Sequence, residues 1–195
     1  MAKGKNDIIL RDRMQMSFDA NGDIATLYGR VDLSDYVSIP KKDGLNIKEV
    51  RFQMRNPNQV KTGSFNQNMV LGVLQDEDAF LKLYATTTAY ETAVDVGIGS
   101  PNVLAVVEHQ TYFTTIQESG ANVGGNLVVD YFEFGVPDLH PEGYPVVTDL
   151  LIGIAATNCT QFSDNTLELD IMIIAEPKKI TEKDMELMLT QGQDL

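Results

Sequence analysis

Apolar and polar side chains alternate along much of the chain, and this alternation predicts β-strands. Between residues 45 and 55, Val50, Phe52 and Met54 are separated by charged or amide-bearing residues. Successive side chains of a strand point to opposite faces, so this segment is expected to have one buried and one solvated face. Across the whole sequence, the same pattern predicts strands at residues 7–18, 23–33, 45–55, 67–74, 79–87, 102–114, 126–136, 146–157 and 166–176.

Two of these segments, 126–136 and 146–157, are apolar on both faces over part of their length. This is typical of central strands that are covered on both sides. Residues 89–97 predict one short helix inside a connection. Because many strands occur without alternating helices, the pattern favours an antiparallel two-sheet sandwich of eight to nine strands over a βαβ fold. Turn-rich connections are expected at 40–44, 55–66, 95–102, 118–125 and 136–145.

A clear helical signal comes at the end of the chain. Thr181 can cap a helix with Asp184 three residues later, and Ile180 and Met185 occupy the flanking staple positions. Gly192 can end this short amphipathic helix. A helix of this length is not stable alone, so it must dock either on its own domain or, as an arm, on a neighbouring subunit. For the second case, the expected subunit contacts are Ile180, Met185, Leu187, Met188 and Leu189.

The organisation that follows is a single domain with two arms. We place an N-terminal arm at residues 1–6, the β-sandwich at 7–176, and a C-terminal arm with the helix at 177–195. No stretch approaches the ~20 apolar residues of a membrane span, and no apolar signal-peptide core follows the first residues, so secretion is not expected. The single cysteine, Cys159, excludes an internal disulfide framework and a cysteine metal cluster.

The chain is strongly acidic, with a formal net charge of −13 and a pI of about 4.4. Such a surface repels phosphate backbones, so strong binding to nucleic acid is not expected. Solubility alone is sufficient to account for the acidity.

One short stretch resembles the start of a calcium-binding loop. Asp19, Asn21 and Asp23 alternate as the first oxygen ligands of an EF-hand would. The sixth and twelfth positions, which need glycine and glutamate, hold Ile24 and Arg30 instead. Asn21 and the glycine that follows it favour a tight turn, so we interpret the stretch as a hairpin turn between two strands.

The two histidines offer little chemistry. His109 is next to Glu108 in an expected strand, so the two side chains should face opposite sides and cannot share a site. A hydrogen-bonded or exposed histidine is the favoured interpretation. In the proline-containing loop at 136–145, Asp138, His140 and Glu142 could hold a metal ion. The prolines and the glycine of this loop are equally typical of a plain surface turn.

No enzyme signature emerges from the remaining residues. Ser100 lacks the second glycine of a nucleophile elbow, and the glycine-rich segment at 119–127 lacks the lysine and the following helix of a phosphate loop. Carboxylates are abundant, so no pair stands out, and there is no tryptophan to form a sugar-binding platform. We therefore expect no catalytic residue, no cofactor, no bound metal and no small-molecule substrate.

The run of strands that ends in EGYPVVTDLLIGIAATN and TLELDIMIIAEP, with non-strand arms on either side, resembles the single jelly-roll capsid proteins of small tailless viruses. The resemblance covers about residues 7–176 and is architectural. It implies a jelly roll of eight strands in two facing four-stranded sheets, with loops at one end and termini exchanged between subunits. The chain departs from the small-RNA-virus members of that family because it lacks a basic arm.

This resemblance implies a structural, non-enzymatic subunit of an icosahedral virus capsid, found in the virion and assembled in the host cytoplasm. Its partners would be copies of itself, and also other capsid proteins or an internal membrane. Two alternatives stay open. One is a ligand- or carbohydrate-binding sandwich, such as a virion fibre head, that uses the loops at 55–66, 95–102 and 118–125. The other is a hydrolase that uses carboxylates or His140.

Overall fold

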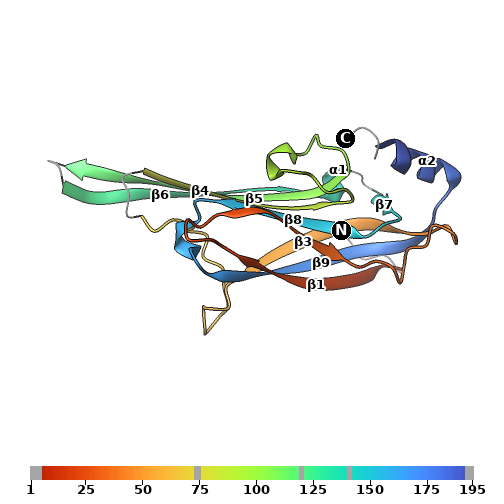
Figure 1. The fold of residues 1–195 in the computed structure, drawn as a ribbon, viewed down its shortest axis with the longest axis horizontal. Helices are drawn as coiled ribbons and strands as arrows, with labels where there is room; N and C mark the ends of the chain where they lie inside the picture. Colours follow the sequence, from red (N-terminus) through yellow and green to blue (C-terminus); the bar gives the residue numbers. More distant parts are fainter. Residues whose placement is uncertain (1–5, 73–75, 119–120, 140–141, 192–195) are drawn as a thin grey trace.

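The computed structural model describes residues 6–72, 76–118, 121–139 and 142–191, which fold into two stacked antiparallel sheets (Figure 1). The described strands are β1 (Ile8–Ser17), β2 (Ile24–Val31), β3 (Asp43–Arg55), β4 (Asp76–Thr86), β5 (Val103–Glu118), β6 (Ala121–Phe134), β7 (Tyr144–Val146), β8 (Leu150–Thr157) and β9 (Thr166–Lys179). The helices are α1 (Val136–Leu139) and α2 (Glu182–Gln191), with the 3-10 turns η1 (Ala93–Asp95) and η2 (Thr160–Phe162).

The strand order is that of a jelly roll with one strand added. One sheet has the order β1-β9-β3-β7 and the other the order β2-β8-β4-β5-β6. With β6 set aside, the first strand pairs with the last, and the pairing continues inward as β2 with β8, β3 with β7 and β4 with β5. This nesting confirms the predicted all-β, antiparallel two-sheet sandwich of jelly-roll type.

The core lies between the sheets and follows the alternation seen in the sequence. In β9, Leu167, Leu169 and Ile171 are buried, and the residues between them are half-buried on the outer face. Burial of one such side chain contributes about 1.5–3 kcal/mol. β8 lies between β2 and β4, which confirms a central strand for residues 150–157 of the segment predicted at 146–157. The first part of that prediction is wrong, because Val146 ends β7 in the other sheet.

Residues 67–72, which the alternation predicts to be part of a strand, form a connection instead. Met69 and Val70 are nevertheless buried in the core. Their backbone N–H groups bond to the hydroxyl of Thr111 and the amide oxygen of Asn68, so side chains replace the sheet ladder here. The prediction is wrong because apolar content alone does not separate a core strand from a connection that fills the core.

The stretch from Asp19 to Asp23 is a turn, as predicted, but it does not close a hairpin. A carboxylate oxygen of Asp19 accepts hydrogen bonds from the backbone N–H groups of Asn21 and Asp23. Gly22 has a φ of 80°, and a Cβ there would overlap the backbone of Cys159. The flanking strands β1 and β2 belong to different sheets, so the hairpin prediction is wrong because the chain crosses between sheets at this turn.

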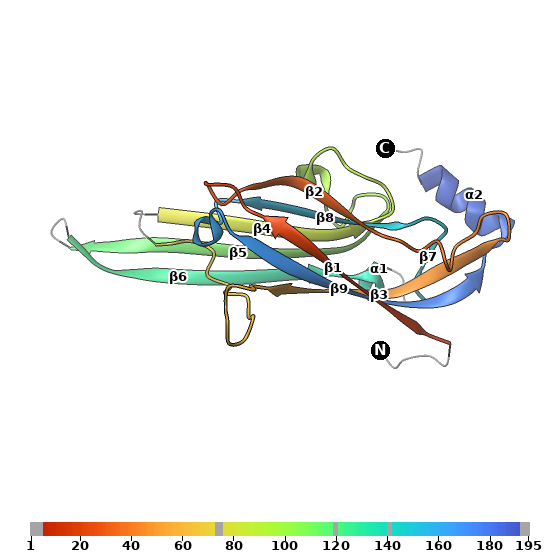
Figure 2. The ribbon, with the colours of Figure 1, turned by 60° about the horizontal axis from the view of Figure 1, so that its bottom comes forward.

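The segment predicted at 126–136 departs furthest from its expectation. β6 is the outer strand of the five-stranded sheet and, within the described residues, pairs with β5 alone. It begins inside the stretch at 118–125 where a turn was predicted. Every described side chain from Gly124 to Glu133 is exposed, so the prediction of a strand covered on both faces is wrong. Together β5 and β6 form a ribbon that projects beyond the four-stranded sheet (Figures 1 and 2).

At the opposite end of the same sheet, the connection at residues 87–102 covers the outer face (Figure 1). It contains only the turn η1 where a short helix was predicted at 89–97. Beneath it the hydroxyl of Tyr84 donates to the hydroxyl of Tyr28 at 2.8 Å, and Tyr28 accepts from the backbone N–H of Tyr90 at 2.7 Å. The outer face is therefore covered at this end and open along the ribbon.

Helix α2 begins after Thr181, as predicted. The N–H of Asp184 donates to Oγ1 of Thr181 at 3.2 Å, and the carboxylate of Asp184 accepts from the N–H of Thr181 at 3.1 Å, which is a reciprocal cap. α2 lies at the end of the sandwich near β7 (Figures 1 and 2). In the part of the chain that the structure describes, no helix has the length and apolar character needed to cross a bilayer.

Replacing Gly153 with alanine should destabilise the fold. Gly153 in β8 is the register partner of both Tyr28 and Tyr84, and a Cβ would overlap the ring of Tyr84. We expect Gly153→Ala to cost about 1–3 kcal/mol, measured as a lower Tm by circular dichroism. Gly99→Ala is the control because open space surrounds a Cβ at Gly99. Equal melting temperatures for the two variants would contradict this packing.

Candidate functional site

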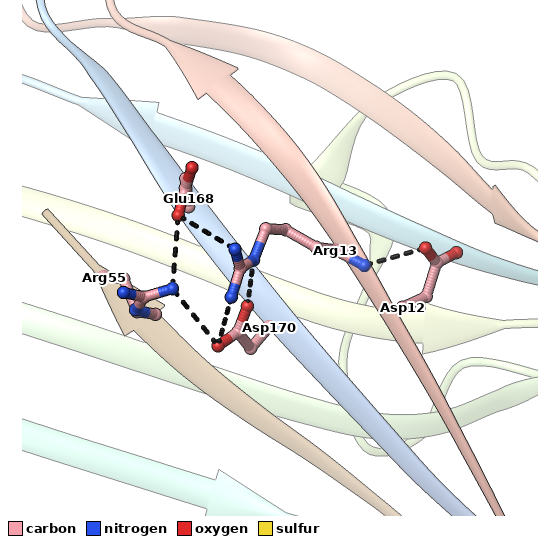
Figure 3. Close-up of polar contacts among 5 residues, drawn as sticks. All are labelled: Asp12, Arg13, Arg55, Glu168 and Asp170. Atoms are coloured by element: carbon pink, nitrogen blue, oxygen red, sulfur yellow. Dashed lines mark hydrogen bonds and ion pairs between the residues drawn. The ribbon is translucent and has the colours of Figure 1, made fainter. Parts of the chain in front are cut away.

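The outer face of the four-stranded sheet carries a network of charged side chains (Figure 3). Arg13 of β1 and Arg55 of β3 flank Glu168 and Asp170 of β9, because the register places the three strands side by side. Nε of Arg13 lies 2.5 Å from Oδ1 of Asp170, and Nη1 of Arg55 lies 3.5 Å from Oε2 of Glu168. Asp12 accepts a hydrogen bond from the backbone N–H of Arg13 at 2.7 Å. The bond to Asp170 raises the pKa of Arg13 above its ordinary value.

A groove of about 610 Å³ follows the same face. Its lining includes three arginines and two aspartates, so the local charge is +1 (3 − 2) on a chain whose net charge is −13. Arg13 is already paired with Asp170, and Arg51 with Glu49. Little positive charge is therefore left for an anionic ligand, and the network chiefly orders this face of the sheet.

A pocket of about 340 Å³ lies beside the inner face of the ribbon, where β3 faces β5. His109 forms part of its wall and is only 9% exposed. Its imidazole ring lies 5.6 Å from the ring of Phe65 and 5.0 Å from that of Tyr131, measured between centroids. Among the described residues, Nδ1 of His109 has no hydrogen-bond partner. Burial lowers the pKa of His109, so the imidazole is neutral at pH 7.

The environment of His109 differs in part from its prediction. Glu108 pairs with Lys82 at 3.0 Å on the other face of β5, which confirms that the two neighbours do not share a site. The expectation of an exposed or hydrogen-bonded histidine is wrong at Nδ1, because aromatic rings rather than polar groups surround it. None of the described lining residues is a carboxylate that could orient His109 as a general base.

The loop considered as a metal site is only partly described. Oδ2 of Asp138 accepts a hydrogen bond from the N–H of Gly135 at 3.0 Å, and the carbonyl of Glu142 accepts from the side-chain amide of Asn46 at 2.5 Å. His140 lies outside the described residues. Within the described ranges, no three His, Cys, Asp or Glu side chains gather as ligands of one metal ion.

The structure describes only some of the side chains predicted to contact a neighbouring subunit at the C-terminus. Ile180 is buried, and a Cβ at Gly44 would meet its side chain, so it packs on its own body. Met185 is half-buried. The side chains of Leu187, Met188 and Leu189, and all of Gly192, lie outside the described residues.

The ribbon is the surface that sequence reasoning missed. Large apolar side chains are exposed on both of its faces: Leu127, Val129 and Tyr131 on the inner face, and Tyr112, Ile116, Val128 and Phe132 on the outer face. With about 150–250 Å² for a large side chain, they expose about 600 Å² of apolar surface. Because the two faces point apart, this surface is divided between two patches, each within the range found on monomeric proteins. The sequence signal for this surface was the apolar run that begins at Leu127, directly after Gly124, Gly125 and Asn126.

Comparisons with known proteins add no assignment. No protein-family model matches the chain, and no curated protein matches it. A solved structure described as the crystal structure of a decameric BFDV capsid protein is 9% identical, with 88% of this chain and 99% of that chain covered and a TM-score of 0.14. At that TM-score the similarity carries no argument, so function must be argued from the chain's own surfaces.

The fold should lose stability as the pH falls below about 6.5 because of His109. Its pKa in the fold lies below the value of about 6.5 in the unfolded chain, so the unfolded chain takes up a proton first. This contribution is complete above about pH 6.5 and decreases toward the folded pKa, by at most about 1.4 kcal/mol per pH unit. His109→Phe should reduce the loss between pH 7 and pH 5 in urea unfolding.

His140→Phe is the matched control for this measurement, because it removes the other histidine of the chain. An unchanged pH dependence in His109→Phe would show that burial of His109 does not govern it.

Proposed function

We propose that the chain is a structural subunit of a virus particle and assembles with copies of itself into an icosahedral capsid shell. The observation that carries the proposal is the ribbon, which leaves seven large apolar side chains exposed on β5 and β6. Soluble monomers blunt or cover a long apolar edge strand, because it otherwise pairs with other chains. In a shell, a neighbouring subunit covers such a strand.

The body of the protein supports the same proposal. A nested jelly roll is a stiff block whose opposite ends are free for loops and arms. The same fold also occurs in lectins and cupins, so the fold alone does not select the function. The uncovered ribbon favours assembly over those uses.

The net charge of −13 sets the conditions for assembly. At 0.01 M salt the Debye length is about 30 Å, so copies of the chain repel one another. At 1 M salt it is about 3 Å, and this repulsion is almost completely screened. An acidic shell also needs another component next to the genome, so we include other capsid proteins or an internal membrane among the proposed partners.

The full chain should form regular particles when expressed alone. We expect a larger fraction of assembled protein as salt is raised from about 0.01 M to 1 M, because apolar contacts persist while charge repulsion is screened. Light scattering after size exclusion, together with negative-stain microscopy, measures this fraction. A clean monomer at every salt concentration would refute the proposal.

Helix α2 is proposed as a second contact, an arm on the neighbouring subunit. Because Ile180 is buried, the test is truncation after Thr181, which leaves the body intact. The shortened chain should keep its Tm within a few degrees and form no particles. If it forms the same particles as the full chain, α2 docks on its own domain instead.

A ligand-binding sandwich is the second candidate, and the pocket at His109 favours it. Phe52, Phe65 and Tyr131 supply aromatic surface there, and Gln53 and Ser64 supply hydrogen-bonding groups. A polar ligand such as a sugar is recognised by this combination. Binding to a glycan array by a monomeric chain would support this candidate over assembly.

A further inference from the structure

We propose that β6 pairs with β6 of a second copy across a two-fold axis, so that two five-stranded sheets join into one ten-stranded sheet. This inference rests on the proposed function, since it names the surface through which copies assemble. It is carried by the open edge of β6 and by the self-complementary order of its side chains.

The edge of β6 that faces away from β5 is open for pairing. Its 14 residues have β5 as their strand partner, and no other strand within the described residues. The backbone N–H of Tyr131 bonds to the carboxylate of its neighbour Asp130 at 2.8 Å, in place of a strand partner. Backbone groups of a strand alternate between its two edges, so those of Leu127 and Val129 point to the same open edge as Tyr131.

When a two-fold axis joins the two sheets into one, side chains on the inner face must lie opposite side chains on the inner face. Residues that lie opposite each other must therefore be an even number of positions apart in the sequence, which places the axis at a residue of β6 rather than between two residues. An axis at Asp130 would place two carboxylates opposite each other. An axis at Val128 places Asp130 opposite Asn126, whose amide can donate to the carboxylate, and Leu127 opposite Val129. Of these two registers, charge favours the one centred on Val128.

Side-chain size selects the same register. It places Phe132 opposite Gly124, around which the space is open to 4 Å, so that each glycine accepts an aromatic ring from the partner. On the inner face the ring of Phe113 already fills the space at Gly125, so the partner's Tyr131 would lie against that ring. The match of a small residue with a large one, which an isologous interface repeats twice, is therefore that of Gly124 with Phe132.

The pairing covers the open edge of β6 and brings the exposed side chains of Leu127, Val128 and Val129 against those of the partner. The faces of the two joined ribbons stay exposed, so their apolar area is left for contacts with other subunits. Antiparallel pairing about Val128 also places the Ala121 end of β6 beside the Phe134 end of the partner's β6.

Cross-linking of the full chain tests the register. In Val128→Cys, the two new thiols face each other with Cα atoms about 4.5–5.5 Å apart, within the reach of a disulfide. The native Cys159 does not interfere, because it is buried and burial raises its pKa to about 12. We expect mild oxidation to convert most of Val128→Cys to a linked dimer on a non-reducing gel.

Two single-cysteine controls sharpen the test. In Val129→Cys the equivalent Cα atoms would lie about 8 Å apart, beyond disulfide reach, so little dimer is expected. Val60→Cys, in a loop where Val60 is 92% exposed, reports random collision. Linking of Val128→Cys no faster than Val60→Cys, or equal to Val129→Cys, overturns the proposed pairing.

Val128→Lys provides a second measurement, because Val128 is 56% exposed and its replacement does not disturb the core. Two lysines would meet at the axis, so self-association should weaken at least ten-fold in sedimentation, whereas Val60→Lys should leave it unchanged. Unchanged association of Val128→Lys overturns the pairing.

The outcomes separate this inference from the proposed function. Linked Val128→Cys dimers in a chain that never forms particles support the β6 pairing and refute the capsid. Particles that form without linking of Val128→Cys support the capsid and show that a surface other than a second β6 covers the ribbon. A monomer under all conditions overturns both.

Discussion

Apolar residues on the face of a sheet stabilise the fold only where another part of the structure covers them. In this molecule the two sheets cover each other over only part of their area. β7, at the edge of the four-stranded sheet, has three residues, whereas β5 and β6 have 16 and 14. The five-stranded sheet therefore extends beyond its partner sheet (Figure 2). The ribbon retains apolar residues that the fold itself does not bury. This mismatch is the basis on which we propose self-association, because other subunits are the simplest cover for the faces and the open edge.

The residues that stabilise the fold differ from those proposed to mediate assembly. The core is closed by nested strand pairs that join the two ends of the chain, β1 with β9, and it contains none of the side chains exposed on β6. Changes at Val128 can therefore alter association without unfolding the sandwich. The charged network around Arg13 and Asp170 lies on the other sheet, where it keeps an outer face solvated. His109 lies in β5 itself, on the inner face of the ribbon, next to Tyr131 of β6.

Much of the fold was accessible from the sequence, because alternation and capping are local signals. β9 and the Thr181 cap were predicted for that reason. The position of β6 was not, since an apolar run reads the same whether its own chain or a partner covers it. The hairpin expected around Asn21 failed because sheet membership is set by distant strands. The pocket at His109 was missed because Phe65 and Tyr131 reach it from separate segments.

Hydrogen exchange of the β6 backbone tests most directly whether the ribbon is where copies meet. The full chain is compared in low salt, where we expect it to be dispersed, and in high salt, where we expect it to be assembled. Amides that point to the open edge, between Gly125 and Tyr131, should exchange at least ten-fold more slowly after assembly, while amides around Val60 remain unchanged. Equally fast exchange of the β6 amides in both states would contradict the account.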